Sequence, residues 1–317
     1  MLFRSQMVKK PLVVLVGPTA VGKTAASIGL AQKLNGEIIS GDSMQIFRGL
    51  DIGTAKITPE EMDGVPHHLI DIKEPWETFS AAEFKQRADQ CIADITERGR
   101  LPILVGGTGF YVNSVLYEYH FGEAERDEAY RQELLQYQTE HGDEALWKLL
   151  EQKDAPSAQR LHCHDSKRII RALEVLHVTG VPASQRQNTL EREQMRYHTV
   201  YLGLNLPRDI LYGRINHRVD QMIAAGLEQE TRQALAQGVA RDALSMTSLG
   251  YRQMVQYING EISLERAVEL IKRDTRHFAK RQLTWFRRDP NIRWVEKQGK
   301  TEQQVEAELL QQIREKL

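Results

Sequence analysis

Residues 11–24 read PLVVLVGPTAVGKT, and this stretch decides the fold class. Its first part, Pro11 to Val16, is an uninterrupted apolar run, typical of a strand in a buried parallel sheet. Its second part matches the phosphate-binding pattern GxxxxGK[ST] at Gly17, Pro18, Thr19, Ala20, Val21, Gly22, Lys23 and Thr24. The glycines let backbone N–H groups surround anionic oxygens, while Lys23 and Thr24 suit a terminal phosphate and Mg²⁺. We therefore predict a strand, a phosphate cradle and a helix from Lys23 to about Leu34.

The segments that follow continue an α/β pattern. A short strand is expected at Glu37 to Ile39 and a buried strand at Leu101 to Val105. Between them, a Ser80-Ala81-Ala82-Glu83 capping box begins a helix that ends at Gly99. The intervening stretch from Asp42 to about Pro75 is rich in Gly, Pro and polar residues, so we expect loop with short helical pieces. This order of elements predicts a parallel sheet with right-handed crossovers.

The pattern changes after Leu116. Residues 118–197 carry charged helical patterns without a strand signal, and a strand is expected again at Thr199 to Leu204. A helix then runs from Pro207 to Gly226, and the rest is expected to be mainly helical. We predict an α/β, P-loop NTPase-like parallel sheet flanked by helices, with an inserted all-helical domain. Its parts are the first part of the core at 1–117, the insertion at 118–197, and core completion with C-terminal helices at 198–317.

The composition is that of a soluble globular protein. Of 317 residues, 41% are hydrophobic and 27% charged, and because the net charge is −1, any nucleic-acid site must come from local clustering of basic residues. Two distant cysteines predict neither a zinc ribbon nor a disulfide framework, and His162-Cys163-His164 is not expected to bind a metal because chain neighbours rarely face one ion. We expect a cytoplasmic protein, since no apolar run reaches membrane-spanning length and no secretory signal precedes the first strand.

The ends of the predicted strands favour transfer chemistry over hydrolysis. P-loop hydrolases usually place a carboxylate at the end of a second buried strand, but here Gly106-Gly107-Thr108 follows Val105. Asp42 follows the other strand instead. A lone acid beside a phosphate cradle suits group transfer, although Asp42 also has the position of a residue that caps the loop after it.

Several segments together resemble the bacterial tRNA dimethylallyltransferase (tRNA isopentenyltransferase) family, from the cradle to about Trp294. They are GPTAVGKT (17–24), GDSMQIFRGLDIGTAK (41–56), PHHLIDI (66–72), GGTGFYVNSVL (106–116), SKRIIRALEV (166–175) and SLGYRQM (248–254). The resemblance implies transfer of a dimethylallyl group from its diphosphate to the exocyclic amine of the adenine at tRNA position 37, 3′ to the anticodon, with Mg²⁺ as cofactor. Diphosphate is released and isopentenyladenosine is formed. Two cysteines cannot build the zinc finger that eukaryotic relatives can carry.

The resemblance also implies roles for single residues. Thr19 and the rest of the loop, with Arg218 and less strongly Arg214, would bind the diphosphate, and Thr24 would hold Mg²⁺. Asp42 would act as general base, because an exocyclic amine loses its proton only as the new bond forms. The adenine would have to leave its stack to reach the cavity, where Gln45 would read its edge. Arg218 could also be an ordinary exposed helix residue, because the helix alone would look the same.

Basic segments are expected to face the tRNA anticodon stem-loop. Residues 267–294 hold eight basic and three acidic side chains, which also fits a solvated charged helix. The residues that the resemblance places at the tRNA are Asp42, Ser43, Met44, Gln45, Thr108, Lys167, Arg168, Ile169, Ile170, Arg171, Thr247, Ser248, Leu249, Gly250, Tyr251 and Arg252. Arg276 and Lys280 are added because they share one basic stripe of the predicted helix. No coiled-coil pattern is present, so we expect a monomer.

Two other classes of function share the cradle. One is a small-molecule kinase or a prenyltransferase that acts on free nucleotides, and the other is a non-catalytic RNA-binding ATPase. Basic residues at 167–171 and 273–288 favour the tRNA enzyme over the first class. The lack of a carboxylate after the buried strand at Leu101 to Val105 favours transfer chemistry over the second class, and loss of prenyl transfer in Asp42→Ala with tRNA affinity kept would decide between them.

Overall fold

The computed structural model describes residues 9–117, 127–185 and 194–317. By its internal contacts the chain divides into two compact units, the first formed by residues 1–118 and 192–317 and the second by residues 119–191. Residue 118, where we predicted that the insertion begins, lies outside the described residues. The other predicted boundary, between 197 and 198, falls at the first residue of the fifth strand.

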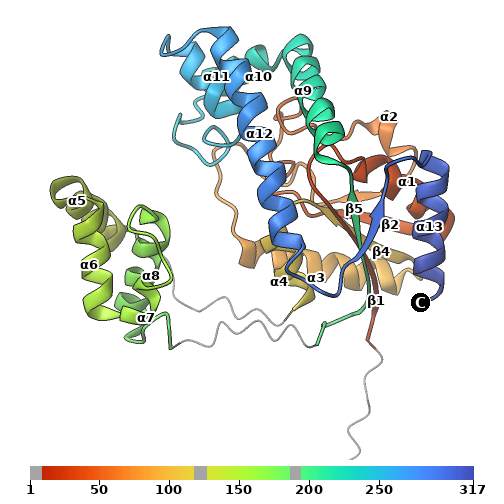
Figure 1. Cartoon of the computed structure of the whole chain (residues 1–317), viewed down its shortest axis with the longest axis horizontal. Helices are drawn as coiled ribbons and strands as arrows, with labels where there is room; N and C mark the ends of the chain where they lie inside the picture. Colours follow the sequence, from red (N-terminus) through yellow and green to blue (C-terminus); the bar gives the residue numbers. More distant parts are fainter. Residues whose placement is uncertain (1–8, 118–126, 186–193) are drawn as a thin grey trace, which may run out of the picture. The chain divides into compact units, whose positions relative to one another are not determined.

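A six-stranded sheet forms the centre of the first unit (Figure 1). All its pairings are parallel, and the spatial order is β3-β2-β4-β1-β5-β6. The strands are β1 Pro11–Val16, β2 Gly36–Ser40, β3 His67–His68, β4 Leu101–Gly106, β5 His198–Asn205 and β6 Arg293–Glu296. Because the strands are parallel, the loops that follow β1, β2 and β4 meet at one edge. The predicted fold class is confirmed.

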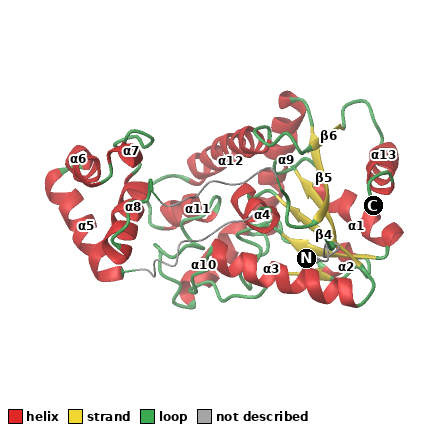
Figure 2. Cartoon of the chain, turned by 90° about the horizontal axis from the view of Figure 1, so that it is seen from below, coloured by secondary structure: helices red, strands yellow, loops and turns green. Residues whose placement is uncertain are grey.

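Helices cover both faces of the sheet (Figure 2). α1 (Lys23–Leu34) and α13 (Glu302–Arg314) pack on one face, while α3 (Ala81–Glu97) and α4 (Gly109–Leu116) pack on the other. The apolar runs of β1 and β5 are buried between them, as the continuous apolar sequence of these strands requires. α1 therefore presents its first turn, with Lys23 and Thr24, directly at the carboxyl end of β1.

Five further helices lie in the described part of the first unit. They are α2 (Pro59–Met62), α9 (Arg208–Ala225), α10 (Leu227–Ala236), α11 (Tyr251–Ile258) and α12 (Leu264–Phe286). α12 packs along α9 and α11. α9 ends as predicted at Gly226, which adopts a left-handed conformation with φ +103°. None of the described helices is long and apolar enough to span a lipid bilayer.

The described part of the second unit is helical. It contains α5 (Glu128–His141), α6 (Asp143–Lys153), α7 (Ala155–Ala158) and α8 (Ser166–Thr179). Leu134, Leu146, Leu150, Ile169 and Leu173 belong to its apolar core. One carboxylate, Glu174, is fully buried beside this core and pairs with Arg131 and Arg171. A buried charge needs such partners, so the two arginines are part of the packing.

Three details of the elements differ from the sequence expectations. β3 lies in a stretch predicted as loop with short helical pieces, and β6 lies in a stretch expected to be mainly helical, where no strand was predicted. Both are short strands at the edges of the sheet. They contain too few residues to show the alternating or continuous apolar pattern that identifies a longer strand. At the start of α3, Ser80 accepts from the Glu83 N–H, but the Glu83 carboxylate pairs with Lys73 and Arg87, so the capping box is only half formed.

Candidate active site

The loop from Gly17 to Thr24 has the conformation that its glycines allow. Gly22 has φ +96° and Ala20 has φ +64°, both in the left-handed region. Gly17 lies so close to β5 that a Cβ there would stand 2.7 Å from the Leu204 carbonyl oxygen. The loop therefore depends on Gly17 for close approach to the neighbouring strand and on Gly22 for its turn into α1.

The Lys23 ammonium is held inside this loop. It donates hydrogen bonds to the carbonyl oxygens of Gly17 at 3.0 Å and Pro18 at 2.9 Å. Burial lowers the pKa of Lys23 from 10.5 to about 8, with Asp42 opposing and Arg218 adding to the shift. The two named charges act on Lys23 because all three groups share one region. A polyanion bound there would restore the charged ammonium.

Asp42 lies shortly after β2 and accepts hydrogen bonds from the loop that follows it. Its Oδ1 accepts from the backbone N–H groups of Met44 at 2.8 Å and Gln45 at 3.4 Å. Its Oδ2 accepts no hydrogen bond from any described residue. One carboxylate oxygen therefore caps the loop, as one of the two interpretations of the sequence has it, while the other keeps its capacity to accept a hydrogen bond.

Arg218 comes from α9 and is half-buried. Burial lowers its pKa, and the nearby Glu61 opposes that shift. Across the described part of the chain, no residue forms a hydrogen bond or an ion pair with its guanidinium. Because even a half-buried charge is costly without a partner, this arginine is a candidate for binding an anion. Arg214, one turn earlier, is exposed.

These groups line one cavity of about 440 Å³. Thr19, Ala20, Gly22, Lys23 and Thr24 come from the loop, Asp42 and Gln45 from the segment after β2, and Arg218 from α9. The structure thus brings together the predicted base, Arg218 and five of the eight loop residues, whereas the lining does not include Gly17, Pro18, Val21 or the exposed Arg214. Thr108 is not among the lining residues. It accepts from the Ser43 N–H at 3.3 Å and so holds the Asp42 segment against the end of β4.

Gln45 lies in the cavity wall with its amide oriented by neighbours. Its Nε2 donates to the carbonyl oxygens of Thr54 at 3.5 Å and Ala55 at 3.3 Å, and its Oε1 accepts from the Ser40 hydroxyl at 3.1 Å. The amide is therefore fixed beside Asp42 by the segment 51–55. A nucleobase could therefore bond only to the donor and acceptor positions of the Gln45 amide that these hydrogen bonds leave open.

Sequence reasoning missed Gln282, a nearly buried residue of α12. Its Oε1 accepts from the Thr19 N–H at 2.9 Å, and its Nε2 donates to the Gly107 carbonyl oxygen at 2.9 Å. A Cβ at Gly107 would lie 2.2 Å from that Nε2. Gln282 thus ties the phosphate loop to the end of β4. Only one feature of the sequence could have revealed Gln282. It is a polar residue that lies three places after Ala279, on the face of the helix that is buried.

Three side chains predicted to contact tRNA are buried. Ile169 and Ile170 are 0% and 4% exposed in the core of the second unit, and Tyr251 is 0% exposed in the first. The prediction that these side chains touch RNA is therefore wrong. It came from taking whole motif segments, whereas a helix presents only some of its residues to solvent.

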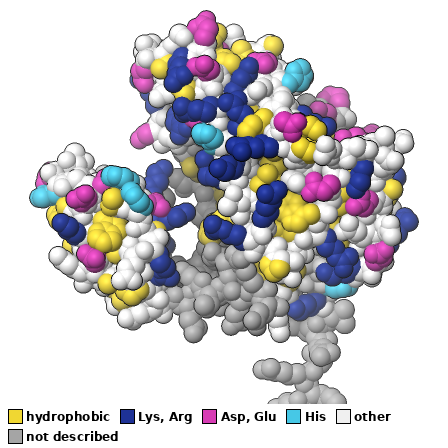
Figure 3. All heavy atoms as spheres, in the orientation of Figure 1, with side chains coloured by type: hydrophobic (Ala, Val, Ile, Leu, Met, Phe, Trp, Pro, Cys, Tyr) yellow, Lys and Arg dark blue, Asp and Glu magenta, His cyan; other side chains and the backbone are white. Residues whose placement is uncertain are grey.

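The other residues of these segments include exposed basic groups. Lys167 and Arg168 are exposed on α8, and Arg252 is exposed on α11. On α12, Lys280 is exposed, while half-buried Arg276 donates to Asn216 Oδ1 at 2.7 Å. Figure 3 shows Lys and Arg side chains gathered over α12. Ser43, Met44, Ser248 and Leu249 are half-buried, Gly250 is buried and Thr247 is exposed.

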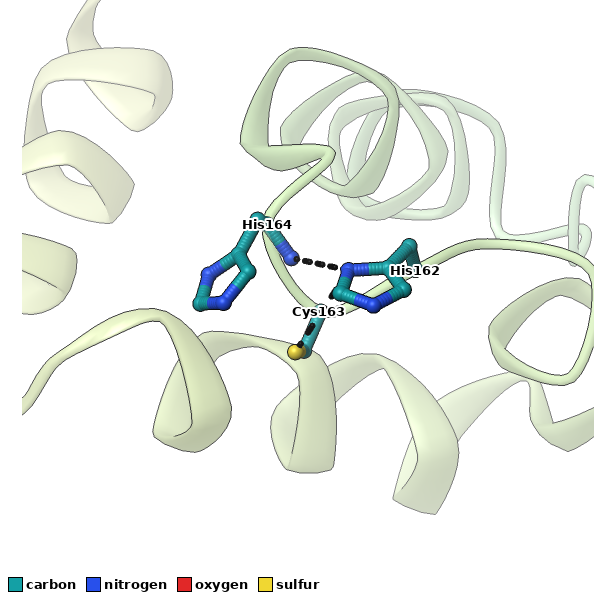
Figure 4. Close-up of side chains that lie close together, drawn as sticks. All are labelled: His162, Cys163 and His164. Atoms are coloured by element: carbon teal, nitrogen blue, oxygen red, sulfur yellow. Dashed lines mark hydrogen bonds between the residues drawn. The ribbon is translucent and has the colours of Figure 1, made fainter.

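The His162-Cys163-His164 run forms a small cluster in the second unit (Figure 4). Its possible ligand atoms lie within 4.8 Å of one another. His162 Nδ1 accepts from the His164 N–H at 3.3 Å, and His164 Nδ1 lies 2.7 Å from Asp143 Oδ2. These bonds occupy one ring nitrogen of each histidine.

Comparison with known proteins points to one family. Residues 45–289 match the family model described as IPP transferase. The tRNA dimethylallyltransferase of Geobacillus thermodenitrificans is 52% identical over 285 residues, covering 90% of each chain. That of Halalkalibacterium halodurans is 50% identical over 288 residues, covering 91% of each.

Solved structures agree with these relatives. The full-length tRNA isopentenylpyrophosphate transferase of Bacillus halodurans superposes with a TM-score of 0.72 at 47% identity, covering 97% of this chain and 98% of that one. A eukaryotic dimethylallyltransferase acting on tRNA superposes with a TM-score of 0.82 at 27% identity, covering 97% of this chain and 80% of that one.

Proposed function

The chain belongs to the IPP transferase family, and from this membership we propose that it transfers a dimethylallyl group from dimethylallyl diphosphate to the exocyclic amine of the adenine at tRNA position 37. The products are diphosphate and isopentenyladenosine in the tRNA. The observation that carries the proposal is the presence of Lys23, Arg218 and Asp42 in one cavity. Two cations suit the diphosphate, and one carboxylate suits the amine.

The proposed reaction has a simple balance. The lone pair of the adenine amine forms a bond to C1 of the dimethylallyl group, and the C1–O bond breaks. The electron pair of that bond leaves with the diphosphate. The amine proton passes to Asp42, whose Oδ2 accepts no hydrogen bond from the described residues and which lines the cavity. A carboxylate helps at this moment because the amine becomes acidic only as its new bond forms.

The diphosphate becomes more negative as the C1–O bond breaks, so the groups that hold it also lower the barrier. Lys23 would exchange its bonds with the Gly17 and Pro18 carbonyl oxygens for bonds to phosphate oxygens. Arg218 would gain the anionic partner that its guanidinium lacks among the described residues. Thr19 already gives its backbone N–H to Gln282, so its hydroxyl is the group left for the diphosphate.

The residues present fit a role for Mg²⁺. The Thr24 hydroxyl stands in the first turn of α1, lines the cavity and bonds to no described residue. A hydroxyl with phosphate oxygens and waters is a usual oxygen set for this ion. When bound, Mg²⁺ would add positive charge beside the leaving diphosphate.

The acceptor would be an unstacked adenine of the anticodon stem-loop. Its amine must reach a cavity inside the first unit, which a base in a stacked loop cannot do. Gln45 would meet the adenine edge, and exposed Lys167, Arg168 and Lys280 would meet phosphates. We propose that the enzyme acts as a monomer in the cytoplasm, where its substrate tRNA is found.

A direct test incubates the protein with Mg²⁺ and labelled dimethylallyl diphosphate, offering either tRNA or adenosine monophosphate. We expect label in the tRNA. Preferential labelling of the mononucleotide would instead show a prenyltransferase of free nucleotides. Hydrolysis of ATP with no prenyl transfer would show an RNA-binding ATPase that uses the same cradle.

A further inference from the structure

We propose that Glu230 is a positioning residue that sets the acceptor side of the cavity through the segment 51–55. This inference rests on the proposed function and assigns a role to two segments, DIGTAK (51–56) and SLGYRQM (248–254), that the mechanism above does not use. Glu230 lies on α10 and is 8% exposed. It does not itself line the cavity.

The Glu230 carboxylate is bound by four donors. Oε2 accepts from the backbone N–H groups of Asp51 at 2.7 Å and Ile52 at 2.8 Å. Oε1 accepts from the Gly53 N–H at 3.0 Å and from the Tyr251 hydroxyl at 2.5 Å. Three consecutive N–H groups around one carboxylate form a nest, and a buried charge of this kind is held in a single geometry.

Tyr251 completes the arrangement from α11. Its side chain is fully buried, and a Cβ at Gly53 would lie 2.5 Å from its Cζ, so the ring rests directly on the segment. Burial and the Glu230 charge raise the pKa of Tyr251, which keeps its hydroxyl protonated and donating. The carboxylate and the ring together fix residues 51–53.

The segment 51–55 connects Glu230 to the lining of the cavity. Thr54 and Ala55 line the cavity, and their carbonyl oxygens accept from Gln45 Nε2. The backbone N–H of Gln45 in turn donates to Asp42 Oδ1. The chain of contacts therefore runs from Glu230 through residues 51–55 to Gln45, beside the proposed base. It does not involve Lys23 or Arg218.

The test measures both substrates separately in Glu230→Gln. The new amide would turn an N–H₂ donor toward backbone N–H donors, so the segment should shift. We expect kcat/KM for tRNA to fall about a hundredfold, the loss that a misplacement of about 1 Å commonly brings. The equilibrium Kd for dimethylallyl diphosphate should stay within about twofold, because the diphosphate groups lie elsewhere.

The matched control is Glu37→Gln, since Glu37 is also a buried carboxylate, paired with His68 and Arg98 at the start of β2. We expect it to lower the melting temperature while kcat/KM for tRNA stays near wild type. If Glu230→Gln does not fold, Tyr251→Phe, which removes one donor to the same carboxylate, replaces it.

A double-mutant cycle identifies the route. If Glu230 acts through Gln45, then in a Gln45→Ala background Glu230→Gln should add little further loss of kcat/KM for tRNA. Full additivity would overturn the inference, as would wild-type kcat/KM in Glu230→Gln or a parallel loss of diphosphate affinity. Absence of prenyl transfer by the wild-type protein would instead reject the proposed function, so the two failures are distinguishable.

Discussion

Asp42 has two roles in the proposed enzyme, as a cap of the following loop and as the general base, and a substitution can separate them. Oδ1 caps the loop through Met44 and Gln45, while Oδ2 remains for the ligand. Asp42→Asn keeps an acceptor for the loop but removes the base. We expect the single-turnover rate of prenyl transfer to fall by about 10²- to 10⁴-fold. The affinity for tRNA should be unchanged.

The control for Asp42 is Asp63→Asn. Asp63 is an exposed residue with φ +47°, a conformation that asparagine tolerates, and it lies outside the cavity lining. This variant should transfer the prenyl group at the wild-type rate. Equal rates for Asp42→Asn and the wild type would remove Asp42 from the chemistry.

The lowered pKa of Lys23 should give the binding of dimethylallyl diphosphate a pH dependence. The pKa of Lys23 in the free protein is lowered to about 8, so the ammonium is charged below pH 8 and loses its proton above it. A bound diphosphate favours the charged form. The affinity for dimethylallyl diphosphate should therefore be highest below pH 8 and decrease above it by up to about tenfold per pH unit.

Calorimetry across a range from about pH 6.5 to about pH 9.5 checks this, and binding near pH 8 should be accompanied by proton uptake. Lys23→Gln should bind more weakly and lack this part of the pH dependence. A wild-type affinity that is flat across pH 8 would contradict the assignment of Lys23 to the diphosphate.

Gln282 offers a third test at the level of one side chain. Gln282→Ala leaves the Thr19 N–H and the Gly107 carbonyl oxygen without their partner, at a cost of about 1–3 kcal/mol for each buried group. We expect a lower melting temperature and weaker binding of dimethylallyl diphosphate. Gln253→Ala removes another buried glutamine, one that bonds Gly250 and Asp274, and should lower stability without weakening the binding of dimethylallyl diphosphate.

At the scale of elements, the strong local signals predicted the structure well. The apolar runs became β1 and β4, and the helix after the cradle spans Lys23–Leu34, the residues predicted for it. The structure of a continuous apolar run or a glycine-lined loop can be predicted from the local sequence, because the interactions that stabilise it are local or nonspecific. The edge strands β3 and β6 have no such run and were missed.

The site was predictable only where its residues belong to a motif. Lys23 and Asp42 are positioned by loops that follow strands, so the sequence brings them to one edge of the sheet. Gln282 and Glu230 reach the same region from helices, and their partners lie 263 and 177 to 179 residues away in sequence. No spacing reveals such contacts. Burial of Ile169, Ile170 and Tyr251 depends in the same way on which helix faces pack.

α8 presents basic residues to solvent, which predicts a salt-dependent role. Reversing Lys167 and Arg168 to Glu should weaken tRNA binding and reduce the dependence of log K on log salt by about one for each phosphate that the variant no longer binds. Turnover at saturating tRNA should change little. The measurement is tRNA affinity at several salt concentrations.

The matched control reverses Lys148 and Lys153, which are exposed on α6 of the same unit. It makes the same change in net charge at a different place. Similar weakening by both pairs would show that only the net charge of the unit matters, and α8 would then have no specific part in binding.

At the scale of the whole molecule, the chain consists of an α/β unit that holds every residue of the cavity and a helical unit interrupting it in sequence. The first unit alone contains the cradle, the proposed base and the Glu230 network. Chemistry and tRNA binding can therefore be measured separately, as the variants above require.

The central claim is that this cavity joins a dimethylallyl group to a tRNA adenine. Its most direct test is the mass of the nucleosides from a digest of tRNA incubated with the protein, Mg²⁺ and dimethylallyl diphosphate. The tRNA carries either adenine or guanine at position 37. We predict a dimethylallyl adduct on adenosine from the first tRNA and none from the second. An unmodified digest, or equal adducts from both tRNAs, would contradict the account.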